Sequence, residues 1–305
     1  MPQAGQVGRV RTTARAGTLA PLVIAGAAAV GLYGSVAVGL VRQWLTDENS
    51  SHGLLLVAAA LFVLYRRRAT FRTLPVAPAN SGLAVLASAL FIYFVGTLTG
   101  DVFILRVSLP IALAGCALAL RGPALTRAAL APLGLLLLAM PIPAVIVTHL
   151  TLPLQLIASD VAAEVLDTSG VFVVQQGNLL VLKDLTLEVA EACSGLRSLV
   201  SLVTVGAVCG AVLSLRPSRA VLLIAAAVPI AVIGNGFRVA ATGFLATWFG
   251  EVAVRGFIHE MTGFVAFLAM CACLVAVQIA ASRVARRRAR VRVREAAGTL
   301  AVSQS

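Results

Sequence analysis

Three short segments of the sequence carry the side chains best suited to chemistry. Each surrounds a reactive group with small or polar neighbours, and they are EACSGLRS around Cys193, NGFR ending at Arg238 and HEMTG beginning at His259. Together a thiol, a guanidinium and an imidazole suit acyl transfer. The thiolate attacks a carbonyl carbon, the guanidinium stabilises the oxyanion, and the imidazole carries a proton to the leaving amine. The sequence predicts an acyl-transfer site if the fold brings the three segments together.

Cys193 differs from the other cysteines in its surroundings. It stands just before an apolar run that begins at Gly195, so its sulfur is expected near the positive end of a helix dipole. Arg197 is expected on the same helical face and adds positive charge. Such settings lower a cysteine pKa from about 8.5 into the range of about 3.5–7.5. The alternative role, a small apolar residue that packs between helices, fits the cysteines inside apolar runs, which are Cys116, Cys209, Cys271 and Cys273.

Arg238 needs a partner near a bilayer, because an arginine at mid-membrane costs about 2.5–3.5 kcal/mol on insertion scales. Asn235 lies about one turn earlier on the same helical face. The pair can present a guanidinium fork and an amide to a carbonyl oxygen or a carboxylate. The alternative is an arginine that snorkels at a helix end.

His259 opens the last apolar run, and a histidine there can exchange a proton near neutral pH. The alternative is a polar cap with no chemical role. His52, in the segment SHG, competes for the same proton-transfer role, and His149 is a weaker candidate.

The composition of the chain predicts a membrane protein. Of its 305 residues, 60% are hydrophobic and 12% are charged, whereas soluble domains are about 45–50% apolar and about 25% charged. The mean hydropathy is +0.98. The net charge of +12, on so apolar a background, favours anionic lipid headgroups over nucleic acid as partners. The five cysteines have no CxxC spacing, so neither a disulfide framework, a metal site nor a cofactor is expected.

The apolar runs predict an all-α polytopic membrane protein of about eight spans. A spanning helix needs about 20 mostly apolar residues. The expected spans are Leu19–Val41, Gly53–Tyr65, Ser81–Leu98, Val102–Leu120, Ala124–Met140, Gly195–Leu215, Ala220–Phe237 and Glu260–Ala281.

Arginines cluster in alternate gaps between these runs, which predicts the orientation because basic loops stay in the cytoplasm. Both termini are then cytoplasmic in a cell-membrane protein, and the three reactive segments lie on the extracytoplasmic side. The expected organisation is a basic N-terminus (1–18), a membrane domain (19–282) and an arginine-rich tail (283–305).

The extracytoplasmic insert at 141–192 is too long to be a plain connector. Ala144–Leu166 is apolar with acidic residues at helical spacing, which suggests a helix at the membrane interface, although it might instead span. Val171–Val189 has short β-branched and leucine runs separated by turn residues, which predicts a small hairpin element of two or three strands before the sixth span.

The ordered segments resemble the exosortase/archaeosortase family of multi-pass membrane cysteine transpeptidases. EACSGLRSL, NGFR and HEMTG carry the resemblance, and SHG at Ser51–Gly53 and QGN at Gln176–Asn178 support it. The similarity runs from about Trp44 to Ala281. Archaeal members tend to have arginine in the last position, so His259 suggests the bacterial exosortase branch.

The resemblance implies that Cys193 is the nucleophile and that Arg238 and His259 complete the catalytic set. Supporting roles are expected for Asn235, Arg197, His52, Ser194 and Gly195. The implied substrates are exported proteins with a C-terminal sorting signal, made of a short motif, a transmembrane helix and a basic cluster. The implied reaction is cleavage through a thioester, outside the membrane, with transfer to an unidentified surface acceptor.

Two other classes of function remain open from the sequence. A transporter or channel subunit could line a polar path with Arg106, Arg238 and His259, although no inverted repeat is evident. A non-catalytic component of an exopolysaccharide or secretion assembly would need no reactive thiol. Both alternatives predict that Cys193→Ala leaves function intact.

Overall fold

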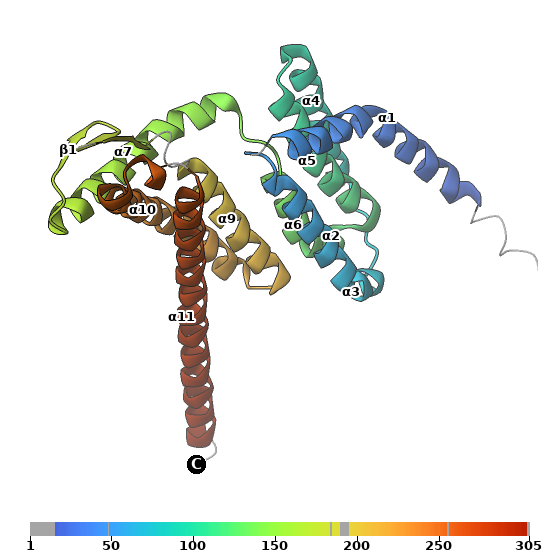
Figure 1. Cartoon of the computed structure of the whole chain (residues 1–305). Coiled ribbons are helices and arrows are strands. Elements are labelled where there is room, and N and C mark those ends of the chain that lie inside the picture. The colour runs from blue at the N-terminus through green and yellow to red at the C-terminus, as the bar shows by residue number, and fades with distance from the viewer. Residues whose placement is uncertain (1–15, 48, 184, 190–194, 255, 304–305) are drawn as a thin grey trace, which may run out of the picture.

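The computed structural model describes residues 16–303 apart from 48, 184, 190–194 and 255, and what it describes is mostly helical (Figure 1). The helices form two groups that follow each other along the chain. Residues 16–138 make the first group, and residues 144–303 make the second together with a small sheet. The reactive segments that the structure describes belong to the second group.

The first group is a bundle with one apolar core. Its helices are α1 (Ala16–Thr46), α2 (His52–Arg66), α3 (Arg68–Thr73), α4 (Ser81–Thr99), α5 (Val102–Arg121) and α6 (Pro123–Leu138). The turn between α4 and α5 has clear local causes: Gly100 adopts the left-handed conformation that ends α4, and Asp101 caps α5 by accepting hydrogen bonds from the backbone N–H groups of Phe103 and Ile104. Leu40, Trp44 and Leu56 lie in the core of this bundle.

The second group begins with α7 (Ala144–Thr168) and a three-stranded antiparallel sheet. The strands are β1 (Val173–Gln176), β2 (Leu179–Leu182) and β3 (Thr186–Glu188), in the order β1-β2-β3. Gln176 pairs with Leu179 across a tight turn in which Gly177 has a φ of +65°. The expected strands are therefore confirmed, and the hairpin element has a third strand.

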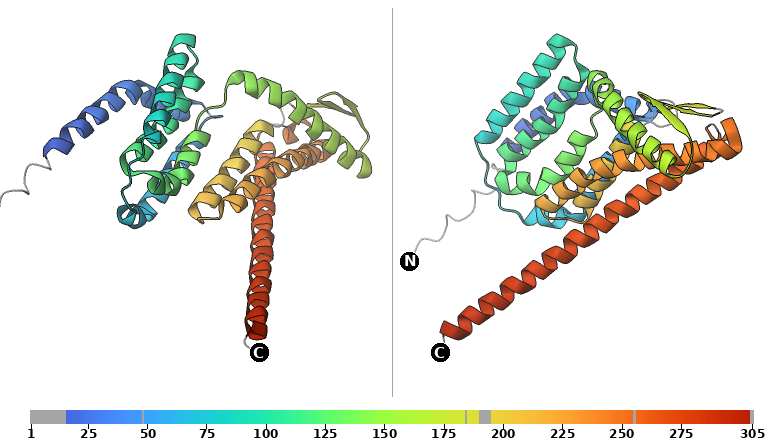
Figure 2. Two further views of the ribbon diagram at one scale, coloured as in Figure 1. Left: turned by 180° about the vertical axis from the view of Figure 1, so that it is seen from behind. Right: turned by 90° about the vertical axis from the view of Figure 1, so that its left-hand side faces the viewer.

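Three long helices complete the second group. They are α9 (Gly195–Val212), α10 (Pro217–Phe249) and α11 (Phe257–Ser303), with a short 3-10 helix, η1 (Gly250–Ala253), before the last. Leu202 of α9, Leu223 and Ala227 of α10 and Met270 of α11 share one buried cluster. Figure 2 shows α11 leaving this cluster and projecting beyond the other helices toward the C-terminus.

The second half of α10 packs outside that cluster, against α7 and the sheet. Val239 and Ala240 of α10 are buried together with Ala158 of α7, Leu180 of β2 and Leu187 of β3. The apolar run was expected to end at Phe237, but the helix continues to Phe249. Its extension supplies the apolar face that covers the sheet.

Six helices within the described residues are long and apolar enough to cross a membrane: α4, α5, α7, α9, α10 and the part of α11 up to Arg287. The expected count of eight is not confirmed. The second and fifth expected spans form the shorter apolar helices α2 and α6, and the first falls inside α1, whose side chains are described only from Val30 onward. The structure thus shows a multi-pass membrane protein.

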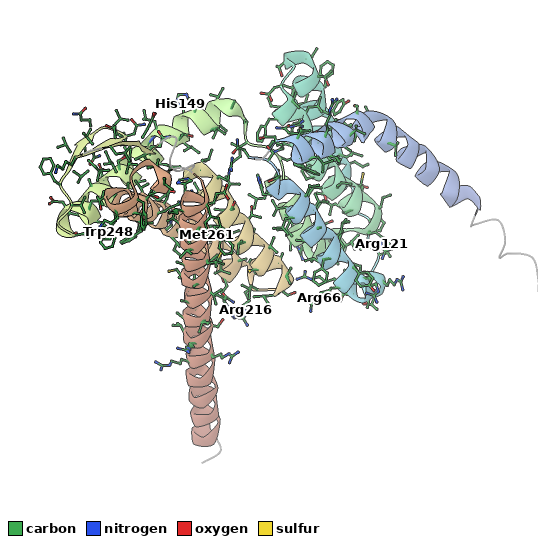
Figure 3. The ribbon with its side chains drawn as sticks, in the orientation of Figure 1. Arg66, Arg121, His149, Arg216, Trp248 and Met261 are labelled. Atoms are coloured by element: carbon green, nitrogen blue, oxygen red, sulfur yellow. The ribbon has the colours of Figure 1, made fainter. Side chains whose placement is uncertain are left out.

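The basic turns of the two groups gather at one end of the molecule. Arg66, Arg121 and Arg216 lie toward one end in Figure 3, and His149 lies toward the other. Arg66 Nη1 donates to the carbonyl oxygen of Val212 at 3.1 Å, which joins the ends of α2 and α9. This separation of arginines from the insert agrees with the alternation expected from the sequence.

Candidate functional site

Arg238 and His259 meet across the gap between α10 and α11. Arg238 Nη2 lies 3.3 Å from His259 Nε2, although the residues are 21 positions apart in the sequence. Arg238 stands inside α10, and His259 lies in the first turn of α11. Because the guanidinium is partly buried and hydrogen-bonded, Arg238 is not a snorkelling arginine at a helix end.

A glycine on α11 makes room for this guanidinium. A methyl group placed on Gly263 would lie 2.8 Å from Arg238 Nη2, 3.0 Å from Cζ and 3.1 Å from Nε. Cβ atoms almost never approach so closely, so the guanidinium occupies the space that a side chain at 263 would fill. Gly263 follows His259 by four residues and therefore lies on the same face of α11. The HEMTG segment thus provides both the partner of Arg238 and the space for it.

The hydrogen bond fixes the protonation of the pair. Arginine is always protonated and has no acceptor atom, so Arg238 Nη2 must donate. His259 Nε2 therefore accepts, and the neutral imidazole carries its proton on Nδ1. His259 Nδ1 and Arg238 Nε are both buried and make no hydrogen bond within the described residues. Each group thus has an N–H that its present partner does not use.

Asn235, three residues before Arg238 on α10, packs against the start of α9. Its side chain is 3% exposed, and its Oδ1 is buried with no hydrogen-bond partner among the described residues. A methyl group on Gly195 would lie 2.9 Å from Asn235 Nδ2. Gly195, the first described residue after the predicted nucleophile, therefore packs directly on α10. Cys193 and Ser194 themselves lie outside the described residues.

An apolar cavity of about 780 Å³ runs between α10 and α11, with Arg238 and Thr262 in its wall. The rest of its lining is almost entirely hydrocarbon, including Ile233, Phe237 and Val265. A long apolar groove with a guanidinium in its wall suits a mainly hydrophobic ligand that carries a single polar group.

A second cavity, of about 500 Å³, lies between the Gln43–His52 segment, α7 and α9. Gly195, Arg197 and His52 are all in its wall. His52 therefore lies near the start of α9 but lines a different cavity from the one that Arg238 lines. His149 lines neither cavity and is exposed on α7. The structure thus pairs Arg238 with His259 and leaves His52 in a separate polar cavity.

Several residues that line this polar cavity or shape the site were not predicted from the sequence. They include Gln43, Asp47, Thr148 and Gln155 in the polar cavity and Gly263 beside Arg238. The spacing of Gly263 from His259 was a usable signal. The cavity residues come from three separate elements, and only the fold brings them together.

No group of three or more potential metal ligands occurs among the residues that the structure describes. Of the five cysteines, the four described ones are free thiols. Cys116, Cys209 and Cys271 are partly buried and Cys273 is exposed.

A family model described as transmembrane exosortase (EpsH) matches residues 44–276, which is more than half of the chain. The chain belongs to the transmembrane exosortase family. The matched range includes the three reactive segments and, apart from Gln43, all the residues that line the two cavities of this exosortase. Neither a search of curated proteins nor a search of solved structures found a match.

Proposed function

We propose that this exosortase is a cysteine transpeptidase that cleaves the C-terminal sorting signals of exported proteins on the extracytoplasmic side of the cell membrane. The observation that carries the proposal is the hydrogen bond between Arg238 and His259. It unites two of the three reactive segments, and the contact of Asn235 with Gly195 ties the third segment to the same face of α10. Gly195 follows Cys193 by two residues, and two residues of chain span at most about 7 Å.

In the proposed first step, the Cys193 thiolate attacks the carbonyl carbon of the scissile peptide bond. A sulfur–carbon bond forms, and the carbonyl oxygen becomes an oxyanion that accepts hydrogen bonds from Arg238. When the guanidinium turns to the carbonyl oxygen of the bound substrate, it releases the Nε2 lone pair of His259. His259 takes the thiol proton as the thiolate forms, and after the attack it delivers that proton to the leaving amine as the carbon–nitrogen bond breaks. The product is a thioester on Cys193.

The apolar cavity between α10 and α11 supports a membrane-bound substrate. Its hydrocarbon walls suit the transmembrane helix of a sorting signal, and Arg238 in the wall can meet the polar peptide at the end of that helix. The basic cluster of the signal would lie at the cytoplasmic face. The same orientation places both termini of the enzyme inside the cell.

The thiol is tested most simply by Cys193→Ala in the cell that makes the enzyme. Membrane proteins that end in a short motif, an apolar helix and an arginine cluster should accumulate at full length, as measured by immunoblotting of a tagged substrate. Cys209→Ala is the matched control, because Cys209 is a partly buried thiol inside α9 and should process substrate normally. Normal processing by Cys193→Ala would exclude a cysteine peptidase.

A further inference from the structure

The polar cavity beside α9 differs from the apolar one in its walls. Amide, hydroxyl and charged side chains line much of it, and they come from the Gln43–His52 segment, α7 and α9. Because Gly195 lines it, the cavity reaches the helix start that follows Cys193.

Two contacts hold the helix ends on either side of the loop that lines this cavity. The indole N–H of Trp44 donates to the carbonyl oxygen of Ala139 at 3.0 Å. Gly53 packs against the same indole so closely that no side chain fits there. These contacts join the end of α1 to Ala139 and to the start of α2. The glycine of the SHG segment is thus needed because Trp44 packs against it.

Within the loop, Asp47 is an anion with neutral partners. Its Oδ1 accepts from the backbone N–H of Asn49 at 3.0 Å, and its Oδ2 accepts from Ser50 Oγ at 2.6 Å. These hydrogen bonds, chiefly the one from Ser50, lower the pKa of Asp47 below its ordinary value. Asp47 is therefore ionised at neutral pH, and neither donor neutralises its charge. Arg197, from α9, lines the same cavity.

His52 is oriented as a base. Its Nδ1 lies 3.0 Å from the carbonyl oxygen of Asn49. Since a carbonyl oxygen only accepts, Nδ1 carries the proton and the lone pair is on Nε2. His259 has the same tautomer, but there the guanidinium of Arg238 occupies Nε2. His52 thus has the basic nitrogen that His259 lacks while paired.

We propose, on the basis of the proposed function, that the cavity between the Gln43–His52 segment, α7 and α9 is the acceptor subsite and takes a primary ammonium group. Asp47 attracts the ammonium, and His52 Nε2 removes one of its protons. The resulting amine attacks the thioester carbonyl, so a carbon–nitrogen bond forms and the carbon–sulfur bond breaks. The Cys193 thiolate leaves, and the attacking nitrogen loses its second proton to it. The products are an amide and the free thiol.

The test uses membranes that contain the full-length enzyme and a tagged substrate identified by its accumulation in the Cys193→Ala strain. Biotin-cadaverine supplies a primary ammonium, and hydroxylamine supplies a nucleophile that is uncharged at neutral pH. The measured quantity is the ratio of nucleophile adduct to hydrolysed product. For Asp47→Asn this ratio should fall about tenfold with biotin-cadaverine, the scale of one charge–charge contact near a protein surface. It should not change with hydroxylamine.

Two further variants test the charge of the cavity from a second helix and supply a matched control. Thr148→Lys puts a positive charge into the cavity from α7 at an exposed position, and it should lower the biotin-cadaverine ratio in the same way. Asp101→Asn is the matched control, because Asp101 caps α5 and is not among the residues that line the cavity. It should behave as the wild type.

Three results would overturn the acceptor subsite. An unchanged biotin-cadaverine ratio in both variants would show that no ammonium binds there. Equal losses with the two nucleophiles would show that the charge of the acceptor is not recognised. A higher KM for the tagged substrate with an unchanged ratio would assign the cavity to the sorting motif instead. In each case cleavage still depends on Cys193, whereas failure of the proposed function itself appears as cleavage by Cys193→Ala.

Discussion

The two sides of α9 hold two imidazoles in opposite situations. On the α10–α11 side, His259 Nε2 accepts a hydrogen bond from a guanidinium beside an apolar cavity. On the other side, His52 donates through Nδ1 to a backbone carbonyl and lines a polar cavity that contains Asp47. Both histidines precede a glycine that packs against a planar side chain. Nε2 of His259 is therefore occupied until Arg238 moves, whereas the Nδ1 hydrogen bond of His52 leaves the lone pair of that histidine on Nε2.

The largest loss of cleavage activity is expected from Arg238→Lys, on the α10–α11 side. Lysine keeps the charge but cannot present two parallel donors, so it cannot give the oxyanion the paired hydrogen bonds of a guanidinium. Loss of one oxyanion donor costs about 10²–10³ in rate in well-studied enzymes. We expect a fall in substrate cleavage of at least that size, measured as the initial rate in membranes. A lysine variant with wild-type turnover would show that the fork is unnecessary.

A smaller effect is expected from Gly263→Ala. The added methyl group would lie 2.8 Å from Arg238 Nη2, so the guanidinium must move away from its place beside His259. Since a displacement of about 1 Å can cost about 10² in rate, we expect kcat to fall by about 10–100-fold. Gly134→Ala is the control, because nothing lies within 4 Å of a methyl group there. Equal kcat values in the two variants would mean that the position of Arg238 is not critical.

Gly53→Ala should have the smallest effect, and on a different quantity. The methyl group would overlap the indole of Trp44, and such overpacking typically costs about 1–3 kcal/mol of stability. The displaced loop carries Asp47 and His52, so we expect a lower thermal midpoint and less amine adduct, measured by thermal unfolding in detergent and by the adduct ratio. Cleavage should fall less than in Gly263→Ala. A larger loss of cleavage than in that variant would reverse the two roles.

Part of this arrangement follows from the sequence alone. The sequence predicted that Arg238 and His259 lie on the same side of the membrane, because both segments interrupt apolar runs there, whereas the hydrogen bond between the two side chains is seen only in the structure. The small sheet was expected because Gly177 and Asn178 separate β-branched runs. The family follows from the order of the three segments and is confirmed by the match over residues 44–276.

Other parts depend on tertiary contacts that a sequence pattern does not contain. The end of α10 was misplaced because hydropathy marks where an apolar run stops, whereas the sheet and α7 cover the helix beyond Phe237. The number of spans was not confirmed, because α2 and α6 are shorter than a full crossing. That His52 lines a different cavity from Arg238 could not be predicted, because its position depends on the contact between Gly53 and Trp44. These two residues are nine positions apart and lie on different helices.

We propose that Cys193 carries the acyl group, and trapping the thioester is the direct test of this role. Membranes with the wild-type enzyme and a tagged substrate can be quenched in acid, digested and examined by mass spectrometry for a substrate-derived acyl group on a cysteine. We expect an adduct on Cys193 that hydroxylamine releases and that builds up further in Asp47→Asn when biotin-cadaverine is the acceptor. Cleaved substrate with no adduct on Cys193, or with the adduct on Cys209 or another thiol, would contradict it.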